Sequence, residues 1–145
     1  MKKISIVTNC YNEEGNISLL YEKVKAEMEK LPYEWELIFE DNASTDGTVQ
    51  VIREICNKDK RVKALLNTRN FGCIRSPHNV MLSAFGDAVI FMVSDLQDPP
   101  ELLPQMIKKW EEGYKIVLGQ KNKSKENTLM YTVRKLFYKI MRTIA

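Results

Sequence analysis

The sequence Val-Ile-Phe-Met-Val-Ser-Asp-Leu-Gln-Asp-Pro-Pro at residues 89–100 is an apolar run that ends abruptly in Asp95, Gln97 and Asp98. A short run of β-branched and aromatic residues is typical of a buried strand. Such strands occur in parallel sheets covered by helices, and these sheets bind ligands beyond the carboxyl ends of their strands. The stretch therefore predicts an α/β fold with a metal or phosphate site where this strand ends.

Similar β-rich segments recur along the chain and alternate with segments of helical periodicity. The expected strands are Lys3–Thr8, Glu36–Glu40, Val62–Asn67, Ala88–Val93 and Lys115–Leu118. The expected helices are Ile17–Leu31, Thr48–Asn57, 76–85, 101–112 and Leu129–Ala145. This alternation predicts a mostly parallel sheet flanked by helices, with every polar loop discussed below at a carboxyl end of a strand.

The composition is that of one ordinary globular domain, with 145 residues, 44% of them hydrophobic and 28% charged. A net charge of +3 is too small to indicate a nucleic-acid binder. No apolar run approaches the roughly 20 residues that cross a bilayer, and the N-terminus resembles a first strand more than a secretory signal. Three cysteines without a Cys-x-x-Cys pair indicate unpaired thiols in a reducing cytoplasm.

The last 25 residues differ from the rest, so we divide the chain into regions 1–120 and 121–145. The second region begins with a basic loop, and apolar residues then recur at helical spacing through Leu129–Ala145. An apolar stripe flanked by cations can lie on an anionic membrane surface. A helix packed on its own domain explains the same pattern equally well.

Amides and acids fill the loops after the first two expected strands, at residues 8–16 and 40–48. Neither loop contains the glycine pattern of a dinucleotide fold or of a phosphate-binding loop. Carboxylates can instead accept hydrogen bonds from base N–H groups and ribose hydroxyls while a metal ion binds the phosphates. Asp46-Gly47 is explained equally well as turn and helix-cap chemistry.

Four segments in this order resemble the family-2 glycosyltransferases of the GT-A fold: Ser5–Glu14, Asp41–Thr48, Arg69–Gly72 and Ser94–Glu101. The resemblance is to the branch of dolichol-phosphate mannose synthases and bacterial polyprenyl-phosphate glycosyltransferases, and it covers nearly the whole chain. It implies a metal-dependent, inverting transfer of sugar from a UDP- or GDP-linked donor to a polyprenyl phosphate or glycan acceptor. Residues 1–120 then form the nucleotide-sugar-binding domain, and residues 121–145 begin the acceptor-side, membrane-proximal region at the cytoplasmic face of the membrane.

The resemblance also assigns site residues. Asp95, Gln97 and Asp98 would hold Mg²⁺ or Mn²⁺, although Asp98 can equally be a helix cap. The residues expected to bind the nucleotide sugar are Tyr11, Asn12, Glu13, Asp41, Asn42, Arg69, Ser94, Lys121 and Arg134. A structural pair formed by Arg69 and Asn70 remains an alternative to a donor contact.

Three departures from the family pattern limit these expectations. Val93 stands where an Asp-x-Asp motif has its first acid, so the metal site has one carboxylate fewer. Lys121 lies where arginine is usual, and lysine neutralises phosphate without a bidentate fork. The chain is shorter than such enzymes, which leads us to expect a fold truncated after the metal-binding half, and no catalytic base can be named.

Two other functions fit parts of the pattern. One is a module that binds the donor without transferring sugar. The other is a receiver-type signalling domain, which also gathers acids at strand ends. A receiver domain needs a phosphoacceptor Asp after its third strand, and here that position reads Asn67-Thr68-Arg69-Asn70.

Overall fold

The computed structural model describes residues 1–120 and 128–144. Strands and helices alternate from the N-terminus, as the sequence predicts. The elements are β1 (Lys3–Cys10), α1 (Glu14–Met28), β2 (Glu34–Asp41), α2 (Thr48–Lys58), β3 (Val62–Leu66), α3 (Gly72–Leu82), β4 (Ala88–Phe91), a 3₁₀ turn η1 (Pro100–Leu102), α4 (Leu103–Glu111) and α5 (Thr128–Ile144).

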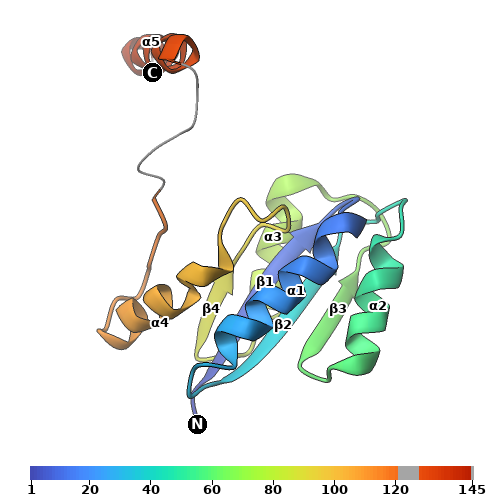
Figure 1. Cartoon of the computed structure of the whole chain (residues 1–145). Helices are drawn as coiled ribbons and strands as arrows, with labels where there is room; N and C mark the ends of the chain where they lie inside the picture. Colours follow the sequence, from blue (N-terminus) through green and yellow to red (C-terminus); the bar gives the residue numbers. More distant parts are fainter. Residues whose placement is uncertain (121–127, 145) are drawn as a thin grey trace.

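The four strands form one parallel sheet in the order β3-β2-β1-β4 (Figure 1). Cys10 pairs with Asp41, and Asp41 pairs with Leu66, so the first three strands end level with one another. Because all the strands are parallel, the loops that follow them meet at a single edge of the sheet. The predicted α/β sheet flanked by helices is confirmed.

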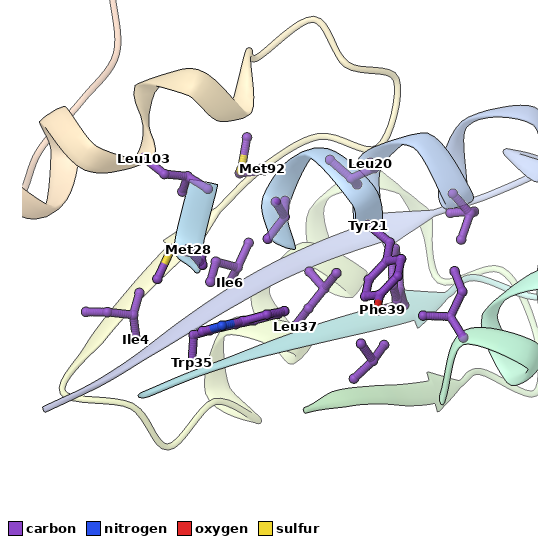
Figure 2. Packing of buried hydrophobic residues seen from close by; sticks show 14 of the residues in the cluster. Ile4, Ile6, Leu20, Tyr21, Met28, Trp35, Leu37, Phe39, Met92 and Leu103 are labelled. Atoms are coloured by element: carbon purple, nitrogen blue, oxygen red, sulfur yellow. The ribbon is translucent and has the colours of Figure 1, made fainter. Parts of the chain in front are cut away.

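The main core lies between the sheet and α1, α2 and α4 (Figure 2). Alternate residues of each strand point to this face, as the period of two in a strand requires. The core residues labelled in Figure 2 are Ile4, Ile6, Leu20, Tyr21, Met28, Trp35, Leu37, Phe39, Met92 and Leu103. A fully buried aliphatic or aromatic side chain stabilises a fold by ~1.5–3 kcal/mol, so this face supplies most of the hydrophobic stabilisation.

The opposite face of the sheet is covered by α3, where Val80 packs on Val7 and Ile38. Near the amino ends of the strands this face buries a charge, because Glu36 is only 2% exposed. Its Oε2 accepts hydrogen bonds from Nζ of Lys3 at 2.7 Å and of Lys63 at 2.6 Å, and its Oε1 accepts the Ser5 hydroxyl at 2.7 Å. These contacts tie β1, β2 and β3 together.

The fifth expected strand, Lys115–Leu118, does not form. Ile116 is 78% exposed and Leu118 84% exposed, and the chain runs on from α4 without returning to the sheet (Figure 1). An apolar β-rich segment becomes a strand only when it pairs with an edge. The sequence pattern is present here, but the pairing is not.

Helix α3 spans Gly72–Leu82, whereas the sequence predicted residues 76–85. Pro77 lies inside this helix. Gly72, with φ of 84°, lies at the true start. None of the helices in the described ranges is both long enough and apolar enough to span a membrane.

Candidate functional site

Backbone strain gathers at the carboxyl edge of the sheet. In the described part of the chain, three non-glycine residues have positive φ: Asn12 at 56°, Ala43 at 62° and Leu96 at 61°. They lie in the loops after β1, β2 and β4 respectively. Asparagine tolerates this conformation, but alanine and leucine rarely adopt it. Strain of this kind persists where the surrounding structure enforces it, often at binding sites.

The loops after β1 and β2 are locked to each other by backbone-to-side-chain hydrogen bonds. The Asn12 N–H donates to Ser44 Oγ at 2.9 Å, and the Thr45 N–H donates to Asn12 Oδ1 at 2.8 Å. One residue later, the Glu13 N–H donates to Thr48 Oγ1 at 2.8 Å. The two loops therefore form one ordered platform.

Asp46 helps to hold these two loops together and does not form part of an open binding site. Its Oδ1 accepts the Thr48 N–H at 3.0 Å, where α2 begins, and its Oδ2 accepts the Glu14 N–H at 3.3 Å. The side-chain hydrogen bond from Thr48 is the largest cause that lowers the pKa of Asp46. The turn and helix-start explanation of Asp46 fits this geometry.

Asp41 differs from Asp46 because one of its carboxylate oxygens accepts no hydrogen bond from the described residues. The residue is 2% exposed, and its Oδ2 accepts the Ser44 N–H at 3.0 Å. Its Oδ1 is buried and has no hydrogen-bond partner among the described residues. An unsatisfied buried acceptor costs about 1–3 kcal/mol, and more when it is charged, so this atom needs a donor group from a ligand or water.

The other predicted residues of the first loop are more open. Tyr11 is exposed, and Glu13 is half-buried with its Oε2 accepting Asn16 Nδ2 at 2.7 Å. Asn12, in contrast, uses its side-chain oxygen within the locked platform. Tyr11 and Glu13 therefore lie where a ligand above the sheet can reach them.

The loop after β3 is held by two amide side chains, the buried Asn42 and the exposed Asn70. Asn42, only 3% exposed, accepts the Phe71 N–H at 2.8 Å and donates from Nδ2 to Asn70 Oδ1 at 2.8 Å. The exposed Arg69 guanidinium lies 4.6 Å from the centre of the Phe71 ring. Asn70 thus has a structural role, whereas the contact of the exposed Arg69 with a donor stays a prediction.

At the end of β4, Ser94 is buried and Asp95 is exposed. Asp95 Oδ1 accepts the Gln97 N–H at 3.0 Å, across the strained residue Leu96. Asp98 is half-buried and does not cap η1, whose N-cap position is Pro99 without a side-chain bond. The cap alternative for Asp98 therefore finds no support.

The side-chain oxygen atoms at and around Asp95 are ligands that suit a hard cation such as Mg²⁺ or Mn²⁺. Two carboxylates and a side-chain carbonyl lie within four residues of one turn, and all are oxygen ligands. Among the described residues, no group of three or more His, Cys, Asp or Glu side chains is placed to hold a metal. A cation here needs other ligands, as Mg²⁺ does when it keeps water and binds substrate phosphates.

Two further predicted residues remain, Lys121 and Arg134. Lys121 is outside the described residues. Arg134 lies on α5, which Figure 1 shows apart from the sheet. Its guanidinium is 5.9 Å from the centre of the Tyr131 ring. Their contacts with a donor stay predictions.

The sequence missed Glu40 and Asn67, which lie beneath the predicted residues. Glu40 is almost fully buried, and its Oε1 accepts Asn67 Nδ2 at 2.8 Å. A glutamate inside an apolar strand was a signal for such a buried partner, because a lone buried charge is costly.

A hollow of the described surface lies elsewhere, lined by residues of α1, of α2 and of the segment that precedes β3. Arg61 in its wall is held by Asp59 at 2.7 Å and by Glu29 at 3.2 Å, and it stacks 4.1 Å from the centre of the Trp35 ring. These contacts account for the arginine structurally, and the hollow lacks the unsatisfied acceptor found at Asp41.

Sequence comparison finds relatives of the same kind as the resemblance suggested. The chain is 36% identical over 143 residues to the uncharacterized glycosyltransferase YkcC of Bacillus subtilis, covering 94% of this chain and 43% of that protein. It is 37% identical over 144 residues to the bactoprenol glucosyl transferase of Shigella phage SfV, covering 99% of this chain and 47% of that protein. The chain thus spans less than half the length of these relatives.

Structure comparison agrees. Glucosyl-3-phosphoglycerate synthase of Mycobacterium tuberculosis, solved with Mn²⁺ and UDP, superposes with a TM-score of 0.57 and 25% identity, covering 75% of this chain and 39% of that one. The sheet is therefore the N-terminal part of a GT-A fold. The model of the glycosyl transferase family 2 matches residues 5–144, and the chain belongs to that family.

Proposed function

We propose that this chain is the donor-binding part of a metal-dependent, inverting glycosyltransferase. The donor is a UDP- or GDP-linked sugar, and the acceptor is a polyprenyl phosphate or a glycan. Support comes from family membership, from a relative named for glucosyl transfer to bactoprenol, and from a structural neighbour that holds UDP and Mn²⁺. Family membership also argues against the receiver-type alternative.

The single observation that carries the proposal is the buried Asp41 Oδ1 without a partner at the carboxyl edge of the sheet. A nucleoside offers hydroxyl and N–H donors that satisfy such an oxygen. Asp41 and Glu13 bind the base and ribose, while Tyr11 on the same loop lies against the nucleoside.

Departure of a nucleoside diphosphate leaves negative charge on its phosphates. Asp95, Gln97 and Asp98 hold a divalent cation, which when bound supplies Lewis-acid stabilisation of that charge. Arg69 and Ser94 bind beside it, the first by charge and the second by hydrogen bonding. Lys121 and Arg134 are further contacts to phosphate in the same proposal.

A phosphate acceptor is already anionic at neutral pH, which reduces the need for a strong general base. We assign no base in this chain. The second region, residues 121–145, contributes to the acceptor side at the cytoplasmic face of the membrane. Exposed Val133, Phe137 and Ile140 repeat at helical spacing on α5 and support contact with lipid.

The test is calorimetric titration with UDP- and GDP-sugars, each with and without Mn²⁺. We expect one base to bind with an affinity that rises when Mn²⁺ is present. Absence of binding by every donor would refute the proposal for this chain. Asp41→Asn is the informative variant, with Glu54→Gln on the exposed side of α2 as the matched control.

A donor-binding module without transferase activity is the second candidate, because the residues argued above act on the donor. Incubation with radiolabelled donor and polyprenyl phosphate separates the two. Sugar transferred to lipid supports the enzyme, whereas binding without product supports the module.

A further inference from the structure

A chain of hydrogen-bonded polar side chains, buried at one end and exposed at the other, runs beneath the proposed donor site. We call it the amide relay, and it consists of Glu40, Asn42, Asn67 and Asn70. Glu40 Oε1 accepts Asn67 Nδ2 at 2.8 Å, and Asn67 Nδ2 also lies 3.3 Å from Asn42 Oδ1. Glu40 is 1% exposed, so the relay starts from a fixed point inside the sheet.

Both polar atoms of the Asn42 side chain are used within the protein. Its Oδ1 accepts the Phe71 N–H at 2.8 Å, and its Nδ2 donates to Asn70 Oδ1 at 2.8 Å. Asn70 Oδ1 also accepts the Gly72 N–H at 2.8 Å. Asn42 therefore holds the loop after β3 through two neighbouring residues, Asn70 and Phe71. Its burial leaves little surface for a ligand.

Arg69 lies between the anchored residues of this loop. Asn67 is fixed before it and Asn70 after it, and Phe71, whose N–H is bound by Asn42, carries the ring against which the Arg69 guanidinium rests. The loop also enters α3 through Gly72, whose φ of 84° suits glycine. The direction of the Arg69 side chain thus depends on the relay.

We propose that Asn42 is a positioning residue, which acts on the donor through Arg69 rather than by touching it. Glu40 and Asn67 fix the buried end of the relay, and Asn42 transmits that position to the Arg69 loop. This inference rests on the proposed function, in which Arg69 contacts the anionic part of the donor. It revises the expectation that Asn42 itself binds the nucleotide sugar.

The chemistry of the relay requires an amide at position 42. An aspartate there would place an acceptor against Asn70 Oδ1, which already accepts the Gly72 N–H. Rotation of the Asn70 amide would remove that clash but would turn a donor toward the Gly72 N–H. Asn42→Asp therefore loosens the loop whichever way Asn70 points.

A double-mutant cycle between Asn42 and Arg69 tests the proposal, with the donor affinity of each folded variant measured by calorimetry. Asn42→Ala and Arg69→Ala should each weaken donor binding roughly tenfold, as is typical when a supporting partner of a binding group is lost. The double variant should bind no more weakly than Arg69→Ala alone. Effects that multiply, or an Asn42→Ala variant that binds normally, would overturn the positioning role.

A second measurement does not depend on the donor. Hydrogen exchange at the amides of Phe71 and Gly72 should accelerate in Asn42→Asp, while Asn57→Asp on exposed α2 leaves them unchanged. Unaltered exchange at both amides would overturn the relay itself. Wild-type protein that binds no donor would instead refute the proposed function and this inference with it, which keeps the two failures distinct.

Discussion

The two ends of β2 each bury a carboxylate, and they treat it in opposite ways. Glu36, near the amino end, is 2% exposed and receives hydrogen bonds from Lys3, Lys63 and Ser5. Asp41, at the carboxyl end, is equally buried but leaves Oδ1 without a partner. The satisfied charge of Glu36 holds strands together, whereas in our proposal the open oxygen of Asp41 receives the donor. The proposed function thus separates structure and binding along a single strand.

The largest effect on the proposed binding edge of the sheet is expected from Asp95→Ala, in the loop after β4. Loss of the exposed carboxylate should abolish the Mn²⁺-dependent part of donor binding, because a cation bound through one or two carboxylates cannot spare one. Calorimetry with and without Mn²⁺ checks this. Thermal unfolding should be nearly unchanged, since Asp95 is at the surface. Retained Mn²⁺-dependent binding would remove Asp95 from the metal site.

The comparison itself is tested by Asp41→Asn against Glu36→Gln. Asp41→Asn should weaken donor binding by roughly ten- to a hundredfold, the worth of a hydrogen bond to a charged acceptor, with little loss of stability. Glu36→Gln should do the reverse, lowering stability while leaving the donor dissociation constant unchanged. Calorimetry gives the donor dissociation constant of each variant, and urea denaturation gives its free energy of unfolding. Equal effects of the two substitutions on binding would contradict the separation.

Lowering the pH should selectively weaken the contacts of Glu36, near the amino end of β2, and so lower the free energy of unfolding. Burial acts to raise the pKa of Glu36, but hydrogen bonds from Lys3, Lys63 and Ser5 outweigh it and lower the pKa to about 2. A folded-state pKa below the unfolded value gives stability that is present at neutral pH and lost as pH falls from about 4.5 toward 2. The loss is at most ~3 kcal/mol, and less because Lys63 is half exposed.

Urea denaturation at pH 7, 4 and 3 measures that loss, and Glu36→Gln is its control. The variant should lack this part of the pH dependence while retaining the contribution of Asp59, whose pKa is lowered chiefly by Arg61. Identical pH profiles in wild type and variant would show that the Glu36 contacts do not couple folding to protons.

The smallest expected effect concerns the strained backbone. Ala43→Gly removes the steric cost of a left-handed alanine, ~1–2 kcal/mol, and offsets most of it by the ~0.5–1 kcal/mol entropic cost of glycine. The net result should be a stabilisation of about 1 kcal/mol or less, measured by thermal unfolding. Ala64→Gly, in ordinary strand geometry on β3, should destabilise instead. A destabilised Ala43→Gly variant would argue against strain at this loop.

The sequence was sufficient for four strands and most helices because hydrophobic periodicity reports which residues face a core. It failed at Lys115–Leu118, where the pattern is right but pairing depends on an edge that lies far away in the sequence. It also placed the start of α3 four residues late, because periodicity specifies the boundaries of an element less well than its existence.

The candidate site was predicted in part for a similar reason. Strand-end acids such as Asp41 and Asp95 stand out in sequence, because charges rarely follow a buried strand by accident. The roles of Asn12 and Asn42 could not be predicted, because the sequence does not distinguish an asparagine that binds a ligand from one that holds a loop in place. The strain at Ala43 and Leu96 leaves no trace in residue type.

The locking of the first two loops has a kinetic consequence. Asn12, Glu13 and Glu14 are tied to the segment Ser44–Thr48 by hydrogen bonds within the protein itself. In the proposed function, these hydrogen bonds already order the backbone that meets the nucleotide. The chain therefore loses little conformational entropy when the nucleotide binds. Encounter with the nucleoside half of the donor should therefore proceed in one kinetic phase, and any slower phase belongs to other parts of the molecule.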